Sequence, residues 1–160
     1  MSGSALLVIV TGPPGAGKTT IARDLGRVLS LPVLYKDSFK EAIVDAIGAA
    51  DLAASQLAGQ AAFAALYAGG AALLDASTGV ILEANFRRGI SERGLRPLAE
   101  RAADTVVVQC EAPAAFVVER SAVLDRSNYD LDLVARLIRV DTSGPEPRPS
   151  ATEISTAVRG

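Results

Sequence analysis

One stretch near the N-terminus constrains the fold of this chain more than any other, the sequence LLVIVTGPPGAGKTT at residues 6–20. The apolar run from Ala5 to Val10 predicts a strand buried on both faces. It leads directly into residues 12–19, which fit the phosphate-binding pattern G-x-x-x-x-G-K-[ST]. Backbone N–H groups must point inward to wrap a phosphate chain, and glycines such as Gly15 and Gly17 permit the curvature and the close approach. The stretch therefore predicts a phosphate-binding loop between a strand and a helix.

The residues of this loop have distinct predicted roles. Lys18 is expected to reach the β- and γ-phosphates of a nucleotide, and Thr19 to place its hydroxyl on Mg²⁺. The helix that begins at Lys18 would present its positive N-terminal end to the anion. An ordinary turn is the alternative, but it has no need of a lysine followed by two threonines. The predicted nucleotide-binding residues are Gly12, Pro13, Pro14, Gly15, Ala16, Gly17, Lys18, Thr19 and Thr20.

Composition excludes several classes of protein. At 160 residues, 49% of them hydrophobic and 21% charged, the chain predicts a single globular domain over residues 1–160. A net charge of −2 argues against non-specific coating of nucleic acid. Cys110 is the only cysteine, which forbids an intrachain disulfide and fits a reducing cytoplasm. We expect no secretory signal and no membrane segment, the alanine-rich residues 42–76 being the nearest approach to one.

The chain contains no histidine. This absence excludes Ser-His and Cys-His nucleophilic systems, histidine-based zinc sites and a histidine general base. Carboxylates, lysine or hydroxyl groups must therefore carry any acid–base chemistry.

Apolar runs and amphipathic segments alternate after the loop. Ser38 is expected to cap a helix, with Glu41 as its capping-box partner, and Asp51 to cap the next one. Residues 125–130 are polar and are predicted to be mobile. The alternation predicts a three-layer α/β/α sandwich around a five-stranded parallel sheet. The predicted helices are 18–30, 39–47, 52–76, 91–103, 114–124 and a short 152–158, and the later strands are 33–35, 79–86, 105–110 and 133–141.

Two carboxylates lie where predicted strands end. Asp37 follows the second strand and Glu83 lies in the third, so both should reach the edge of the sheet that carries the phosphate-binding loop. Glu83 is predicted to hold Mg²⁺ or its water shell, although strands commonly end in an acidic residue. For Asp37 the alternative is a carboxylate that satisfies the N-terminal N–H groups of a helix.

The segments GPPGAGKT, KDSFK, VILEANF, VVVQCEAP and VDTSGP occur in an order that is similar to that of small AAA-type kinases. These are related to the kinase domain of polynucleotide kinases and to zeta-toxin-like kinases, within the nucleoside-monophosphate-kinase-like P-loop fold. The likeness runs from about Leu6 to Pro145. GPPGAGKT is specific for the superfamily, whereas KDSFK and LEANF are moderately specific for this branch.

The resemblance implies roles for residues of the second and third strands. Asp37 matches the carboxylate that takes the proton from the attacking hydroxyl in polynucleotide kinases. Lys40 falls where that family has an arginine that touches substrate phosphate. Glu83 and Asn85 fall on the motif at the third strand, which is usually headed by Asp.

The resemblance also implies a lid at about residues 114–130, with Arg120 as the arginine that approaches the transferring phosphoryl group. A second lid arginine is expected about a turn later, where this chain has Leu124, and Arg126 is the nearby substitute. Relatives often have histidines in this region. The loop of Thr142, Ser143 and Gly144 would lie beside adenine.

Together these features predict transfer of the γ-phosphoryl group from ATP·Mg²⁺ to an alcohol, on a small molecule or at the 5′ end of a nucleoside or polynucleotide. Nucleic acid is expected only as such a 5′-hydroxyl substrate. A regulatory ATPase or switch without an acceptor is the rival, and a binding protein with a degenerate lid is a second. A GTPase is disfavoured because the guanine motif N-K-x-D is missing. The acceptor and the oligomeric state stay open.

Overall fold

The computed structural model describes residues 5–111 and 126–160, and its five strands form one parallel sheet in the order β2-β3-β1-β4-β5. The strands are β1 Leu6–Thr11, β2 Val33–Tyr35, β3 Val80–Glu83, β4 Asp104–Glu111 and β5 Arg136–Asp141. The helices are α1 Lys18–Leu29, α2 Lys36–Ile47, α3 Leu52–Asp75, α4 Glu92–Arg101, the 3₁₀ helix η3 Arg126–Tyr129 and α5 Ala151–Arg159.

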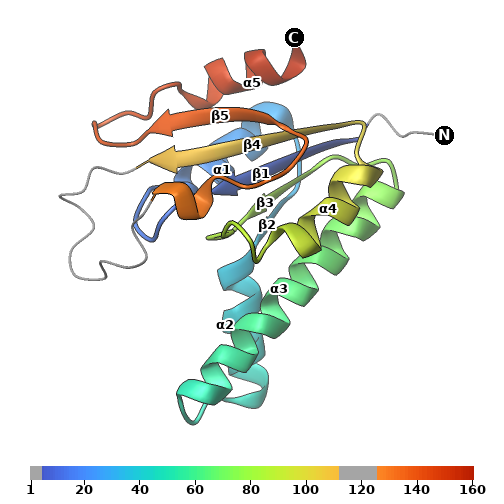
Figure 1. The fold of residues 1–160 in the computed structure, drawn as a ribbon, viewed down its shortest axis with the longest axis vertical. Coiled ribbons are helices and arrows are strands. Elements are labelled where there is room, and N and C mark those ends of the chain that lie inside the picture. Colours follow the sequence, from blue (N-terminus) through green and yellow to red (C-terminus); the bar gives the residue numbers. More distant parts are fainter. Residues whose placement is uncertain (1–4, 112–125) are drawn as a thin grey trace.

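Helices cover both faces of this sheet (Figure 1). On one face, α1 and α5 bury residues such as Leu25 and Ile154 against the strands. On the other face, α3 and α4 do the same with Leu66 and Leu95. Because parallel strands are covered on both sides, their apolar residues need no alternation, which is why β1 is an unbroken apolar run. The predicted α/β sandwich with a five-stranded parallel sheet is confirmed.

The strand order creates a crevice at the end of β1. The chain runs from β1 outward to β2, returns to β3 beside β1, and then crosses to β4 on the other side of β1. Connections leave in opposite directions at such a point, so the carboxyl ends of the central strands stay uncovered for a ligand. This edge carries the loop at residues 12–17 together with Glu83, which pairs with Val10 of β1 and Tyr35 of β2.

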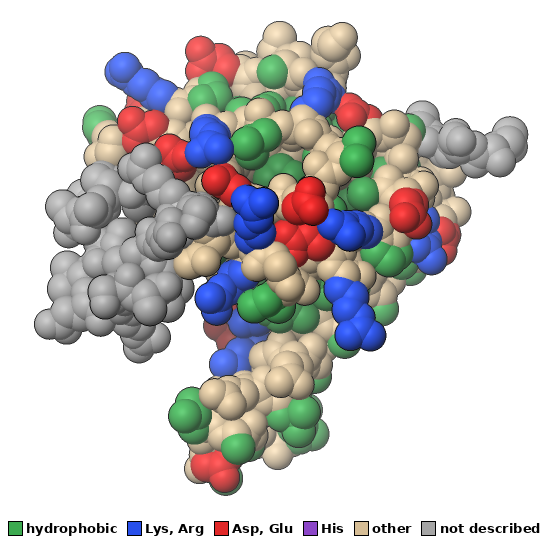
Figure 2. Space-filling model, in the orientation of Figure 1, with side chains coloured by type: hydrophobic (Ala, Val, Ile, Leu, Met, Phe, Trp, Pro, Cys, Tyr) green, Lys and Arg blue, Asp and Glu red, His purple; other side chains and the backbone are tan. Residues whose placement is uncertain are grey.

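The helices α2 and α3 form an arm that extends beyond the sheet (Figure 1). No residue of α2 is buried, and apolar side chains are exposed towards the tip of the arm, among them Ile47, Leu52 and Leu57 (Figure 2). By length and composition alone, α3 could cross a membrane, with a mean hydropathy of 1.5 and 28% of the apolar window buried. This is weak evidence, because the core helix of a soluble protein passes the same test.

The structure differs from the local predictions at three places. The helix α2 begins at Lys36 directly after β2, so Ser38 lies inside its first turn and cannot cap it, and that prediction was wrong. Within residues 125–130, expected to be mobile, residues 126–129 form η3 and Tyr129 is fully buried. The last helix is longer than predicted, since Ser150 and Glu153 form a capping box at its start. The predicted helix at 114–124 lies outside the described residues.

Two helical glycines should respond oppositely to the same substitution. A Cβ on Gly94 of α4 would overlap the ring of Tyr67 on α3, whereas a Cβ on Gly59 of α3 would meet nothing within 4 Å. Gly94→Ala is expected to lower the free energy of unfolding by about 2 kcal/mol through overpacking. Gly59→Ala should raise it by about 0.5 to 1 kcal/mol by removing glycine's backbone freedom from a helix. Urea denaturation measures both, and equal effects would contradict the close packing of α4 on α3.

Candidate active site

The loop between β1 and α1 needs glycine at its two ends. Gly12 has a φ of 143° and is packed so tightly that a Cβ would overlap the carbonyl oxygen of Cys110 on β4. Gly17 has a φ of 76° and forms the N-cap of α1. Both backbone conformations lie in the region that residues with side chains rarely adopt. The glycine spacing of the motif is therefore a steric requirement of this loop.

The start of α1 is arranged to receive an anion. Its N-cap is Gly17, no side chain caps it, and its first turn contains no acidic residue. Its N-terminal N–H groups are therefore not taken up by a capping side chain, and no acidic residue of its own first turn offsets its positive dipole. The ammonium group of Lys18 donates a hydrogen bond to the Pro13 carbonyl oxygen at 2.8 Å, so it lies folded across the loop. Helix start, loop and lysine fit a phosphate chain.

Beside the loop, Glu83 is buried and Lys18 is half-buried. The hydroxyl of Thr19 donates a hydrogen bond to Glu83 Oε2 at 3.2 Å, and Glu83 is only 6% exposed. Burial raises the pKa of Glu83, although Lys18 and the Thr19 hydrogen bond both act to lower it. Burial likewise lowers the pKa of Lys18, against the effect of Glu83 and Asp37. Both charged forms are therefore disfavoured by the lack of water.

A hydroxyl and a carboxylate oxygen are donors that Mg²⁺ accepts, so Thr19 and Glu83 fit the predicted metal site. Within residues 5–111 and 126–160, no group of three or more acidic, cysteine or histidine residues could hold a metal. A cation here would therefore need oxygens of phosphate or water to complete its coordination. That requirement is typical of Mg²⁺ bound together with a nucleotide.

Asp37 lies in the first turn of α2 with its side chain 80% exposed. Its Oδ1 accepts a hydrogen bond from Lys36 Nζ at 3.0 Å, and the hydrogen bonds of the described residues include none to it from a helix N–H group. Asp37 raises the pKa of both Lys18 and Glu83, so its charge acts on the same small region. The carboxylate is therefore open to solvent just after β2, within electrostatic range of Lys18 and Glu83.

Lys36 pairs with Asp37 and was not singled out in the sequence analysis. Its side chain is 13% exposed, and its ammonium lies 5.5 Å from the centre of the Phe63 ring, a cation–π distance. Its one sequence signal is its place directly before Asp37. Lys40 follows one turn later on α2 and is partly buried. Arg120 lies outside the described residues, and Arg126 is the first residue of η3.

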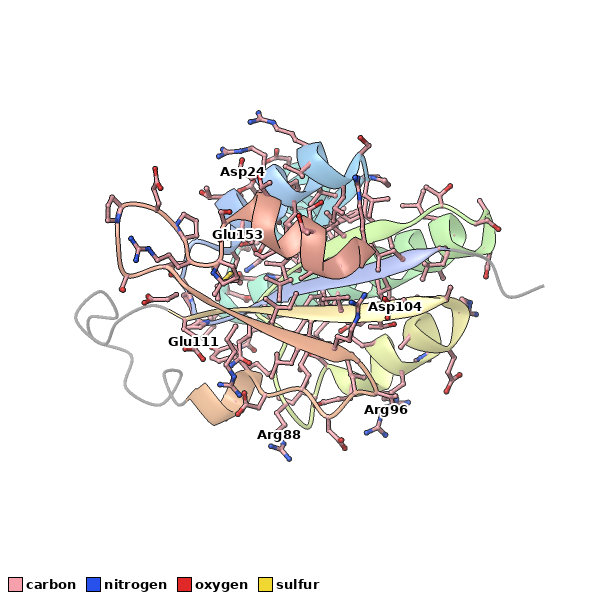
Figure 3. The ribbon with its side chains drawn as sticks, turned by 90° about the horizontal axis from the view of Figure 1, so that it is seen from above. Asp24, Arg88, Arg96, Asp104, Glu111 and Glu153 are labelled. Atoms are coloured by element: carbon pink, nitrogen blue, oxygen red, sulfur yellow. The ribbon has the colours of Figure 1, made fainter. Side chains whose placement is uncertain are left out.

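The loop after β5 borders the phosphate-binding loop. A hollow of about 340 Å³ is lined there by Asp141, Ser143, Gly144, Pro145, Glu146 and Arg148. Glu111 lies at the carboxyl end of β4, on the side of the phosphate-binding loop, and Asp104 lies at the other end of that strand (Figure 3). Arg88 and Arg96 point to solvent from another side of the molecule. Arg96 pairs there with Asp132 at 3.1 Å. Of the loop after β5, Thr142 contacts the phosphate-binding loop, at the Ala16 carbonyl oxygen, and Ser143 and Gly144 line the hollow beside it, whereas Arg88 and Arg96 lie elsewhere.

Comparisons with known proteins agree with this geometry. A family model described as an AAA domain matches residues 7–138. A crystal structure of a candidate kinase from Chloroflexus aurantiacus J-10-fl is 31% identical, with a TM-score of 0.84 over 98% of this chain and 97% of that chain. A sugar kinase from Janibacter sp. HTCC2649 is 19% identical, with a TM-score of 0.63 over 97% of this chain and 94% of that one. No curated protein sequence matches the chain.

The APS kinase of Mycobacterium tuberculosis, solved with AMPPNP and APS, is 18% identical, with a TM-score of 0.63 over 98% of this chain and 96% of that one. At such identities, the sugar kinase and the APS kinase show the shared fold alone. Together with the family match and the 31% identity, they show that the chain has the fold of the small P-loop kinases, the nucleoside-monophosphate-kinase-like fold.

The raised pKa of Glu83 predicts a pH-dependent effect of Glu83→Gln on the ligand-free protein. Ionisation of Glu83 destabilises the folded state, so its cost is absent below the ordinary value of 4.5 and complete above the folded-state pKa. The variant should therefore melt at a higher temperature than the wild type at pH 8, and this difference should vanish towards pH 4. Circular dichroism melts across this range measure it, with the exposed Glu100→Gln as control. A wild type that melts higher than the variant at pH 8 would contradict the prediction.

Proposed function

The chain belongs to the AAA domain family, and on this premise we propose that it is a kinase that transfers the γ-phosphoryl group of ATP to a hydroxyl group of its acceptor. The acceptor class proposed is an alcohol, either of a small molecule or at the 5′ end of a nucleoside or polynucleotide. The similarity to a candidate kinase at 31% identity supports phosphoryl transfer but does not choose the acceptor.

One observation carries the proposal. The Asp37 carboxylate is 80% exposed, and its charge acts on both Lys18 and Glu83. A regulatory switch needs Lys18 and a carboxylate for the metal, as proposed for Glu83, but it has no use for a further solvent-exposed carboxylate at the start of α2. A kinase needs such a group to meet the acceptor hydroxyl.

The residues have separate roles in the proposed reaction. The N–H groups of the loop and the Lys18 ammonium would hold the phosphates and neutralise charge that develops on them during transfer. Asp37 would accept a hydrogen bond from the acceptor hydroxyl, orient its oxygen towards the γ-phosphorus and take its proton late in the transfer. Mg²⁺, held by Thr19 and Glu83, would supply further neutralisation of the phosphate oxygens. Lys40 would contact an anionic part of the acceptor, and the lid arginines Arg120 and Arg126 would face the transferring group.

The nucleotide proposed is ATP. The base would lie in the hollow beside Ser143 and Gly144, which has room for a purine at about 340 Å³. The missing guanine motif N-K-x-D supports adenine over guanine.

Two measurements test the proposed reaction. Isothermal titration with Mg·ATP tests nucleotide binding, and ADP release is then screened over nucleosides, 5′-hydroxyl oligonucleotides, sugars and hydroxylated antibiotics. ADP release that rises only when one alcohol is added supports the kinase. Release at the same rate with every acceptor, or with none, would identify a regulatory ATPase instead.

Two substitutions separate binding from transfer. Lys18→Ala should abolish turnover while leaving the fold intact, because the lysine meets the transferring phosphoryl group. Asp37→Asn should lower the transfer rate by about 100-fold or more, the usual contribution of a general base, and leave the affinity for Mg·ATP nearly unchanged. The transfer rate and the dissociation constant of Mg·ATP are measured for each variant.

Asp24→Asn is the matched control for Asp37→Asn. Asp24 lies on α1 and also pairs with the residue before it, since Arg23 Nε lies 3.2 Å from its Oδ1. The control should transfer at the wild-type rate. If Asp37→Asn weakened Mg·ATP binding alone, Asp37 would be a metal-shell ligand and its assignment as the base would be wrong.

A further inference from the structure

Thr142 links the loop after β5 to the phosphate-binding loop. Its hydroxyl oxygen lies 3.0 Å from the carbonyl oxygen of Ala16 and 3.1 Å from that of Glu111. Its backbone N–H also donates to the Glu111 carbonyl oxygen, at 3.1 Å. Three strands or loops that are far apart in the sequence therefore meet at this one threonine.

The hydroxyl has a single proton, so it can donate fully to only one of the two carbonyl groups. The Glu111 carbonyl oxygen already accepts a hydrogen bond from the backbone N–H of Thr142. The Ala16 carbonyl oxygen, in a residue that is only 1% exposed, gains a donor from the Thr142 hydroxyl. A buried carbonyl without a donor costs free energy, so the arrangement favours the bond to Ala16. The methyl group of Thr142 also lies near Gly17, since a Cβ added to that glycine would stand 3.6 Å from it.

Ala16 and Gly17 form the half of the loop that leads into α1. The direction of their peptide groups decides where the N–H groups of the loop point. The other end of the loop is already held, since Gly12 packs directly on the carbonyl group of Cys110. The contact with Thr142 therefore holds the second end. Cys110 of β4 thus supports the loop at Gly12, and Thr142, just after β5, supports it at Ala16.

We propose that Thr142 is a positioning residue for the phosphate-binding loop, holding Ala16 and Gly17 in the conformation that receives the phosphates. The proposal rests on the proposed function in one respect, that the loop binds a nucleoside triphosphate. It assigns the hydroxyl of Thr142 to the loop, in place of the role beside adenine that the sequence resemblance implies.

Thr142→Val tests this assignment, because valine keeps the shape and removes the hydroxyl. The probes are Mg·tripolyphosphate, Mg·AMP-PNP and adenosine, each titrated by calorimetry. Loss of one buried hydrogen bond should weaken binding of Mg·tripolyphosphate and of Mg·AMP-PNP by about tenfold and leave adenosine unchanged. Weaker binding of adenosine and Mg·AMP-PNP with unchanged tripolyphosphate would place Thr142 at the base and overturn the proposal.

Rescue and a matched control exclude a general loss of structure. Thr142→Ser keeps the hydroxyl and should bind tripolyphosphate within about twofold of the wild type, since the hydrogen bond is retained. Thr156→Val removes a comparable hydroxyl, which lies 3.1 Å from the Thr152 carbonyl oxygen on α5, and should leave all three affinities unchanged. If Thr142→Val does not fold, Thr142→Ser and Thr142→Ala carry the comparison, and equal affinities for tripolyphosphate in those two overturn the proposal.

The two hypotheses fail differently. Wild-type protein that binds neither Mg·AMP-PNP nor Mg·tripolyphosphate overturns the proposed function and the role of Thr142 with it. Wild-type protein that binds both, together with a Thr142→Val variant of equal affinity, overturns the role of Thr142 alone.

Discussion

Wrapping of a phosphate chain by backbone N–H groups is the constraint on which the rest of this structure depends. Such a loop needs backbone conformations that only glycine adopts readily, as at Gly12 and Gly17, and it needs a strand that delivers it and a helix that begins at its end. The strand must be central, because the crevice for the ligand lies where neighbouring connections leave in opposite directions. The position of β1 between β3 and β4 meets this requirement.

In the ligand-free protein, the charged forms of Lys18 and Glu83 are both disfavoured by burial. Burial is the largest influence on the pKa of both Lys18 and Glu83, and in each case it opposes the charged form. A polyanion next to the lysine and a divalent cation next to the carboxylate would each restore the charge balance that water otherwise provides. Functional sites commonly carry such local costs, which the stability of the surrounding fold offsets.

The two sides of the candidate site differ in how much chemistry their residues carry. The nucleotide side is built from glycines, a lysine and hydroxyl residues whose spacing is specific. The proposed acceptor side is the arm of α2 and α3, in which α3 is rich in alanine and Lys36, Asp37 and Lys40 lie in the first turns of α2. At the base of this arm, the rings of Phe63, Tyr67 and Phe86 lie with centroids 5.9 to 6.4 Å apart.

The fold class, the phosphate-binding loop and the edge of the sheet where Glu83 lies beside it could all be predicted from the amino-acid sequence. These follow from apolar periodicity and glycine spacing, which are properties of short segments. Only the tertiary structure decided that α2 begins at Lys36, that Tyr129 is buried and that Lys36 lies over Phe63. The hydrogen bond from the Thr142 hydroxyl to the Ala16 carbonyl oxygen joins residues 126 positions apart, so it too could be seen only in the folded structure. Burial and contacts between distant segments depend on which elements the topology brings together, and no local pattern carries that information.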